Sequence, residues 1–283
     1  MSDIRTIEAA LIADTVRELC IKACTRLPGS VCALLDAARA DEPFPPAQET
    51  LDLIIRNAGI AADTNVPICQ DTGMAVVYAD VGQDVHIVGG LLEDAVNEGV
   101  ARGYTDGYLR KSIVRDPIRR GNTGDNTPAV LHTRLVPGDR IKLTVSPKGF
   151  GSENMSKVCM LTPADGLEGV KRFVKQTVLT AGANPCPPMM LGIGIGGTFE
   201  KVAQLAKEAL VELREGPHPD PYYDALEEEL LREINALGIG PQGFGGKTTA
   251  LSVRIKTYPT HIAGLPVAVN VGCHVTRHAE AVL

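Results

Sequence analysis

The sequence predicts a mixed α+β fold that forms one compact unit. Apolar residues recur every three or four positions over residues 3–28, which is typical of an amphipathic helix. Residues 74–81 and 189–195 are instead short apolar runs close to glycine or proline, which is typical of strands. A chain of 283 residues that is 44% hydrophobic and 22% charged can bury a sizeable core. We therefore expect residues 1–283 to form a single globular domain.

The first half of the chain is expected to be helical before residue 60 and to contain strands after it. Asp3 or Ser2 can cap the free amides at the start of the first helix. The second helix aligns its apolar residues on one face and has Gly59 as its stop signal. The expected elements are helices over 3–28, 47–58 and 91–103, and strands over 74–81 and 85–88.

Residues 104–128 are the least regular part of the chain. They contain five cations, namely Arg110, Lys111, Arg115, Arg119 and Arg120, followed by a Gly- and Asn-rich run. A run of charges is usually a solvated face, whereas a long irregular loop in a compact domain is often functional. Both interpretations remain open for this segment.

The second half alternates further strands and helices. Residues 130–136 and 140–146 predict a hairpin, because the turn signal Pro137-Gly138-Asp139 separates two strand-like runs. The hairpin leads into residues 148–154, where glycines beside Lys148 would let backbone amides approach an anion. The remaining expected elements are helices over 166–180, 199–213 and 222–237, and strands over 189–195, 250–258 and 266–271.

Composition excludes some classes of function. The net charge of −6 disfavours non-specific nucleic-acid binding, and the absence of Trp argues against a stacking platform for single strands. An anionic ligand would need locally gathered cations. The first residues contain no uninterrupted apolar run, so we expect neither a signal peptide nor a membrane span, and a cytoplasmic protein.

The seven cysteines fall into two groups. Cys20, Cys24, Cys32 and Cys159 stand among apolar residues and are expected to be small core residues. Cys69, Cys186 and Cys273 each stand in a loop rich in proline or glycine, and no CxxC pair exists among them, which excludes the ordinary zinc-ribbon and ferredoxin patterns. Three such thiolates favour a cubane iron–sulfur cluster with one iron not ligated by protein, which would act as a Lewis acid.

Three weaker patterns also occur, and the last two of them keep a rival class open, namely a non-catalytic zinc- or nucleotide-binding module. Gly192–Gly197 mimics a dinucleotide fingerprint, but we expect those glycines to serve close helix–sheet packing. Gly240–Thr249 is similar to a phosphate-binding loop in a reversed context, with a helix before it and a strand after it. His274 and His278 have the spacing of one helical face and could form a zinc site with Cys273.

Four motifs, in this order and spacing, carry a resemblance that spans nearly the whole chain. They are Pro67-Ile68-Cys69-Gln70-Asp71-Thr72-Gly73, Lys148-Gly149-Phe150-Gly151-Ser152, Asn184-Pro185-Cys186-Pro187-Pro188 and Gly272-Cys273. Together they resemble the class I (iron–sulfur) fumarate hydratases and L(+)-tartrate dehydratases. Phe150 stands where that family would lead us to expect another glycine. The chain is similar to the alpha subunit of a two-subunit member, which is equivalent to the N-terminal domain of the fused enzymes.

The resemblance implies a cofactor and a set of site residues. Cys69, Cys186 and Cys273 would hold a 4Fe-4S cluster whose fourth iron binds a 2-hydroxy dicarboxylate. The substrate pocket would be lined by Gln70, Asp71, Arg110, Lys148, Gly149 and His261. A dianionic substrate needs guanidinium and backbone donors, which Arg110 and the glycine loop could supply, while Asp71 could act as general acid and His261 could bond a carboxylate.

The resemblance also implies a partner and a reaction. In the fused enzymes a C-terminal domain carries the proton-abstracting base, so a beta subunit is expected to supply the base here. The expected reaction is reversible hydration of fumarate to malate, with dehydration of tartrate to oxaloacetate as the alternative.

Overall fold

The computed structural model describes residues 4–211 and 216–283. The chain folds into two compact units that interleave in sequence. The first unit comprises Met1–Pro28, Ala58–Phe150 and Arg277–Leu283, and the second comprises Gly29–Asn57 and Gly151–Thr276. The predicted mixed fold class is confirmed, whereas the assignment of residues 1–283 to a single domain stays a prediction.

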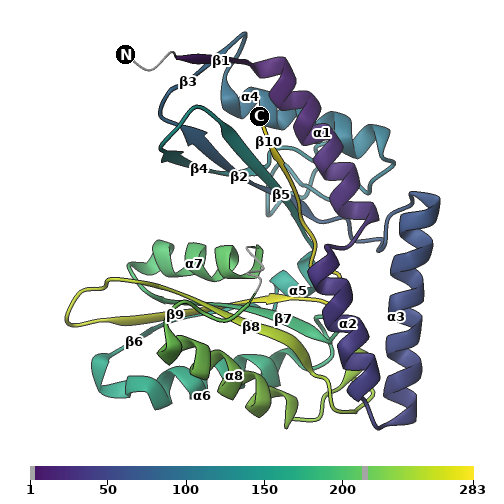
Figure 1. Ribbon diagram of the computed structural model, residues 1–283, viewed down its shortest axis with the longest axis vertical. Coiled ribbons are helices and arrows are strands. Elements are labelled where there is room, and N and C mark those ends of the chain that lie inside the picture. The colour runs from purple at the N-terminus through teal and green to yellow at the C-terminus, as the bar shows by residue number, and fades with distance from the viewer. Residues whose placement is uncertain (1–3, 212–215) are drawn as a thin grey trace. The chain divides into compact units, whose positions relative to one another are not determined.

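The first unit is a four-stranded mixed sheet with two helices packed together beside it (Figure 1). The strand order is β10-β5-β2-β4, and a separate parallel pair joins β1 to β3. The elements are β1 (Arg5–Glu8), α1 (Ala9–Thr25), β2 (Met74–Gly82), β3 (Val85–Val88), α4 (Leu92–Asp106), β4 (Val130–Val136), β5 (Ile141–Lys148) and β10 (Ala279–Val282).

Helices α1 and α4 approach each other closely because α4 carries glycines on the shared face. A Cβ on Gly99 would lie 2.6 Å from the carbonyl oxygen of Ala13, and a Cβ on Gly103 would lie 2.9 Å from Cys20 Cβ. Cys20 and Cys24 are fully buried in this interface, as predicted. Burial raises the pKa of both thiols, that of Cys24 to about 11, so both stay protonated and unreactive.

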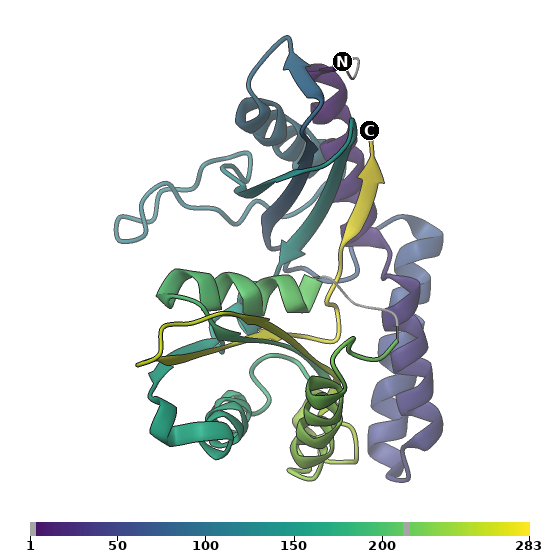
Figure 2. The same cartoon turned by 60° about the vertical axis from the view of Figure 1, so that its left-hand side comes forward.

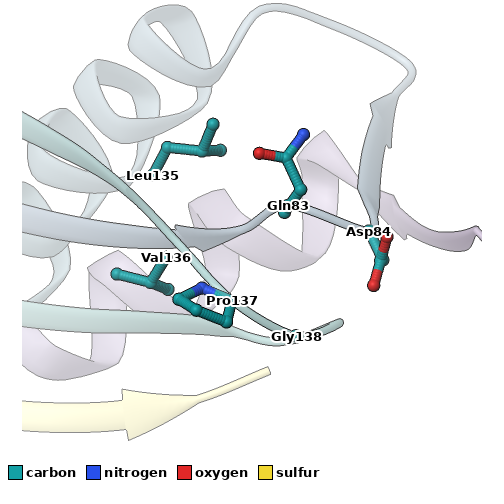
Figure 3. Close-up of a pocket in the computed structure, with 6 residues that line it drawn as sticks. All are labelled: Gln83, Asp84, Leu135, Val136, Pro137 and Gly138. Carbon is teal, nitrogen blue, oxygen red and sulfur yellow. The ribbon is translucent and has the colours of Figure 1, made fainter.

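The predicted hairpin over residues 130–146 is wrong, although its two strands exist. β2 lies between β4 and β5, parallel to the first and antiparallel to the second. The 136–140 turn passes around the end of β2: Gln83 N donates to Val136 O and Asp84 N donates to Gly138 O. These bonds replace the direct ladder that a two-strand hairpin would form. A cavity of about 360 Å³ lies at this turn, apart from every predicted site residue (Figure 3).

The predicted first helix is also too long at its start. Residues 5–8 form β1, because each of them pairs with a residue of β3 in a parallel ladder, and α1 begins only at Ala9. The predicted caps Ser2 and Asp3 lie outside the described residues.

The second unit is a four-stranded sheet covered on both faces (Figure 1). The strand order is β6-β9-β7-β8; α7 covers one face, and α6 and α8 cover the other. Its elements are α2 (Gly29–Asp41), β6 (Lys157–Leu161), η1 (Pro163–Asp165), α6 (Gly166–Ala181), β7 (Met189–Gly196), α7 (Phe199–Val211), α8 (Pro221–Asn235), η2 (Pro241–Gly243), β8 (Ala250–Tyr258) and β9 (Leu265–Gly272).

Helices α3 (Pro45–Thr64) and α5 (Phe150–Glu153) contribute residues to both units. The sequence missed α2 and placed the stop of α3 at Gly59, but the helix continues for five more residues. The left-handed residue that follows it is Asn65, with φ 57°. Cys32 and Cys159, predicted to be core residues, are only partly buried. None of the helices in the described part of the chain is long and apolar enough to cross a membrane.

The glycines of β7 serve close packing, as predicted. A Cβ on Gly192 would lie 2.1 Å from the carbonyl oxygen of Ala206 in α7, and one on Gly194 would lie 2.2 Å from that of Val202. No real side chain fits at such distances, so these positions set how near α7 can come to the sheet. The glycine spacing that mimics a dinucleotide fingerprint therefore has a packing explanation.

We expect Gly192→Ala to destabilise the protein by about 1–3 kcal/mol, because the added methyl group must push the backbone of α7 away from β7. The thermal midpoint should fall by roughly 2–4 °C per kcal/mol. Gly29→Ala is the matched control, since a Cβ there meets nothing within 4 Å. Equal midpoints for the two variants in differential scanning calorimetry would contradict the packing role.

Candidate active site

In the first unit, buried donors hold the loop that contains Cys69. Ile68 N donates to Cys24 O at 3.0 Å, and the buried phenol of Tyr104 donates to Thr72 O at 2.6 Å. Burial raises the pKa of Tyr104, so the phenol remains a donor. Thr72 Oγ in turn donates to the carbonyl oxygen of Arg110 at 2.8 Å. The loop between α3 and β2 is thus tied to α1, to α4 and to the start of the basic segment.

The carboxylate of Asp71 joins this loop to the glycine loop that follows β5. Asp71 Oδ1 accepts from Gly73 N at 3.0 Å, and Oδ2 accepts from Phe150 N at 2.8 Å. A Cβ on Gly73 would lie 2.6 Å from the backbone of Lys148, which explains glycine at this position, where φ is 72°. Phe150 contributes its amide to this junction. Asp71 therefore has a structural function that the sequence did not predict.

The other predicted residues of the first unit lie around this junction. The Cys69 Sγ atom accepts from Asp71 N at 3.4 Å and lies 3.3 Å from Gln70 Oε1. Lys148 is buried, at 7% exposure, and its Nζ lies 3.2 Å from Gly149 O. The structure therefore brings Cys69, Gln70, Asp71, Lys148 and Gly149 together. Arg110 is exposed, and its main chain joins the group through Thr72.

Two residues that sequence reasoning missed complete this part of the site. Asn126 is fully buried and left-handed, with φ 66°; its Nδ2 donates to Gly73 O at 3.1 Å and its Oδ1 accepts from Ser112 N at 2.6 Å. Arg277, also buried, donates to the carbonyl oxygen of Asp71. The signal for Asn126 was its place in the Gly- and Asn-rich run. Nothing in the sequence marked Arg277 except its position shortly after Cys273.

The segment between α4 and β4 is irregular, as predicted, and runs as a long open loop (Figure 2). Its polar side chains bond its own backbone: Asp116 accepts from Ile118 N and Arg119 N, and Asn122 accepts from Gly124 N. These bonds hold the pKa of Asp116 below its ordinary value. The loop therefore has a defined conformation. Both of its ends are bonded to the residues that follow Asp71, because Arg110 O accepts from Thr72 Oγ and Asn126 Nδ2 donates to Gly73 O.

In the second unit, Cys186 and Cys273 lie at the same end of the sheet. Cys186 precedes β7 and Cys273 follows β9, and these strands pair so that Met190 is opposite Gly272. His274 joins the two loops, because its backbone N donates to Cys186 O at 3.4 Å and its Nδ1 lies 2.9 Å from the same oxygen. Cys273 Sγ accepts from Val275 N at 3.4 Å.

His261 lies at the opposite end of the same sheet. It follows β8, and its neighbour Thr260 bonds Gly197 O at the far end of β7. The eight residues of β9 separate this end from Cys273 by about 27 Å, at about 3.4 Å per residue. His261 instead lines a cavity of about 410 Å³ together with Lys201, Tyr258 and the start of α7. Within one chain, the structure does not bring His261 to Cys273.

In the loop Gly240–Thr249, which has the phosphate-loop pattern, backbone amides bond a carboxylate of the protein itself. The Glu42 carboxylate, 1% exposed, accepts from Lys247 N at 2.8 Å and from Thr248 N at 3.2 Å. The Lys247 ammonium group pairs with Asp41. The amides that a phosphate would need are therefore engaged, and the predicted reversed order of helix, loop and strand is confirmed.

The zinc pattern after Cys273 lacks the geometry it requires. Residues 273–278 are not helical, so His274 and His278 do not share a helical face, and His274 Nδ1 contacts Cys186 O. Among the described residues, no group of three or more His, Cys, Asp or Glu side chains has the arrangement of a metal site.

The donor set nevertheless has the chemistry of cluster ligands. Cys69, Cys186 and Cys273 stand in loops; Cys69 and Cys273 are partly buried and Cys186 is exposed, unlike the buried Cys20 and Cys24. Two of the three sulfur atoms, those of Cys69 and Cys273, accept a backbone N–H, a contact that tunes iron–sulfur centres in proteins. Cys69 belongs to the first unit and the other two belong to the second.

Comparison with known proteins decides the family. The model of the fumarate hydratase (Fumerase) family matches residues 13–282. This chain belongs to the fumarate hydratase family. The resemblance carried by the four motifs is thereby confirmed, and the chain is a hydro-lyase of the fumarate hydratase or tartrate dehydratase type.

The similar proteins of this family are named as alpha subunits. The chain is 40% identical over 274 residues to a protein of Methanocaldococcus jannaschii whose assignment as an L(+)-tartrate dehydratase subunit alpha is itself provisional, covering 95% of this chain and 96% of the relative. It is 31% identical over 256 residues to the L(+)-tartrate dehydratase subunit alpha of Escherichia coli strain K12, covering 89% of this chain and 84% of the relative.

Proposed function

We propose that this chain is the alpha subunit of an iron–sulfur L(+)-tartrate dehydratase. The choice of tartrate as the substrate is supported by the names of the relatives, which are 31–40% identical to this chain and are named as L(+)-tartrate dehydratase alpha subunits. They support the tartrate alternative better than the fumarate reading that the sequence analysis placed first. Fumarate hydration remains the second candidate, because the family model is named for it.

The reaction places clear demands on the site. One hydroxyl group leaves from one carbon of tartrate and a proton leaves from the neighbouring carbon, which gives the enol of oxaloacetate; the enol then tautomerises to the ketone. The substrate carries two carboxylates throughout, so cationic and backbone donors must hold it. A group that protonates the leaving hydroxyl and a base on the other carbon complete the chemistry.

Cys69, Cys186 and Cys273 are our proposed ligands of a 4Fe-4S cluster. When bound, such a cluster supplies a Lewis acid for the hydroxyl and carboxylate of a 2-hydroxy acid. Their exposure and the N–H donors on two of their sulfur atoms support this assignment. Arg277, which follows Cys273 by four residues in the sequence, donates to the Asp71 carbonyl oxygen.

Asp71 is our proposed general acid, and Arg110 and Lys148 are the proposed carboxylate-binding cations. Asp71 is held in place by the amides of Gly73 and Phe150, so its orientation is set before substrate binds. The exposed guanidinium of Arg110 has no ion pair among the described residues and is therefore available to an anion. Gln70 and the Gly149 amide complete the proposed set of polar groups.

A beta subunit is our proposed partner, and it supplies the base. The relatives are named as alpha subunits, which supports a second kind of chain in the active enzyme. The chain on its own should therefore bind the cluster but turn over little substrate.

His261 can share a pocket with the Cys273 loop only if the histidine comes from a second copy of the chain, because about 27 Å of β9 separate the two within one copy. We therefore place His261 in the site as a residue of the neighbouring copy. A closed two-fold assembly would provide two such sites.

The experiment that tests the substrate compares tartrate and fumarate directly. The chain is co-expressed with the beta subunit from the same source, purified without oxygen, and assayed for oxaloacetate from L(+)-tartrate and for malate from fumarate. We expect kcat/KM for tartrate to exceed that for fumarate by about tenfold or more, the equivalent of about 1.4 kcal/mol in transition-state binding. A preference for fumarate of that size would reverse the assignment.

A further inference from the structure

Two side chains far apart in sequence, Gln242 and His274, hold the backbone next to Cys186. The carbonyl oxygen of Cys186 accepts a hydrogen bond from the backbone N of His274 at 3.4 Å, and it lies 2.9 Å from the ring Nδ1 of the same residue. The next carbonyl oxygen, that of Pro187, accepts the backbone N and the side-chain Nε2 of Gln242, both at 2.8 Å. The Gln242 amide also lies 3.2 Å from His274 Nδ1. We call Gln242 and His274 the cysteine clasp.

The clasp fixes a backbone conformation that would otherwise be unfavourable. Cys186 and Gln242 both have φ 54°, a left-handed value that costs a non-glycine residue free energy. Four contacts to two consecutive carbonyl oxygens oppose that cost. The carbonyl group of Cys186 is therefore held in one direction, and this sets the direction in which the Cα–Cβ bond of Cys186 leaves the chain.

The loop that carries Gln242 is itself rigidly anchored. Gly240 approaches the backbone of Gly245 so closely that a Cβ would lie 1.9 Å from the Gly245 carbonyl oxygen. At the other end, the buried Glu42 carboxylate accepts from Lys247 N and Thr248 N. Gln242 therefore bonds Pro187 O from a loop that is held at both ends.

His274 is the immediate neighbour of Cys273, so the clasp couples both proposed ligands of the second unit. Moving Cys186 away from Cys273 would break the contacts of His274 and of Gln242 together. Contacts of this kind around metal ligands usually orient the ligands and raise their affinity for the metal.

We propose that Gln242 and His274 are positioning residues that hold Cys186 and Cys273 as a preformed pair before iron arrives. The proposal rests on the proposed cluster function and adds to it the residues that decide how fast and how firmly the cluster assembles. Neither residue touches the substrate in this proposal; each acts through the backbone of Cys186 and Pro187.

The test is anaerobic reconstitution of the co-purified complex after removal of iron. Gln242→Ala removes the side-chain donor, and Gln176→Ala is the matched control, because Gln176 is exposed on α6 and its side chain bonds Thr180 in the same helix. The readouts are the rate of growth of the visible iron–sulfur absorbance, iron and sulfide per chain, the electron paramagnetic resonance spectrum after reduction, and the thermal midpoint of the iron-free protein.

We expect Gln242→Ala to lower the affinity for iron, or the rate of cluster assembly, by about 10-fold to 100-fold, with an altered resonance spectrum. The Gln176→Ala protein should match the wild type. If Gln242→Ala also lowers the thermal midpoint, Gln242→Met is compared instead, since it keeps a side chain of similar length and removes the N–H donor without adding a charge. His274→Gln, which keeps a side-chain N–H donor, should retain more of the assembly rate than His274→Ala.

The outcomes separate the two proposals. A wild-type protein that takes up no cluster refutes the cluster function itself. A wild-type protein that takes up the cluster, while the Gln242 variants do so at the same rate and with the same spectrum, refutes the clasp and leaves the function intact.

Discussion

We expect replacement of Cys69 with serine to remove the iron–sulfur chromophore and the hydro-lyase activity together. A serine hydroxyl is a far poorer ligand for iron than a thiolate, and the two remaining cysteines cannot complete a three-thiolate site. We expect activity to fall by at least about a thousandfold, because the protein would lose the Lewis acid that a bound cluster would supply. The measurement is iron and sulfide content, visible absorbance and turnover of the anaerobically purified complex.

Cys159→Ser is the matched control for this prediction. Cys159 is also a partly buried free cysteine, but it lies within strand β6 and outside the three loops. The control protein should keep its colour and activity. A Cys69→Ser protein that also keeps both would overturn the proposed ligand set.

Mixing two inactive variants should restore activity if His261 serves a neighbouring copy. Cys273→Ser removes a proposed cluster ligand, and His261→Ala removes the proposed carboxylate contact. In a two-fold assembly of both variants, one of the two sites combines an intact cysteine set with an intact histidine. Random pairing makes half of the assemblies mixed, so we expect about a quarter of wild-type activity. The measurement is turnover after co-expression of differently tagged variants with the beta subunit.

The control for this experiment mixes two chains that both carry Cys273→Ser, which should stay inactive. A mixture of the two different variants that shows no more activity than the His261→Ala complex alone would exclude His261 from a shared site. It would favour a local role for this residue, whose Nδ1 already accepts the Ala263 backbone amide at 3.2 Å.

The position of Asp71 shows how far a motif can be interpreted from the sequence. Its place two residues after Cys69 indicated a site residue, because Pro67 stiffens the loop before it and Gly73 permits the turn after it. The amides of Gly73 and Phe150 that its carboxylate accepts could not be predicted, since Phe150 comes 79 residues later in the chain. The same holds for Asn126, whose amide bonds Gly73 across 53 residues.

Most strands were predicted, but their neighbours were not. The runs over β2, β4 and β5 are locally apolar and end at turn residues, so their existence follows from short-range chemistry. The turn at Pro137-Gly138-Asp139 suggested that β4 and β5 pair with each other. In the fold β2 lies between them, because its amides complete the sheet with both strands at once. Pairing partners depend on the whole sheet, which no local pattern contains.

The sequence by itself determined the fold class, the family and the three loop cysteines, because each of these depends on residue type, local spacing and the order of motifs. The tertiary structure alone decided how these motifs are held. It placed Asp71 between two backbone amides, joined the Cys186 and Cys273 loops through Gln242 and His274, and put His261 at the far end of β9. Those arrangements depend on contacts between residues distant in the chain, and the free energy of such contacts is set by packing and hydrogen bonding in the folded protein.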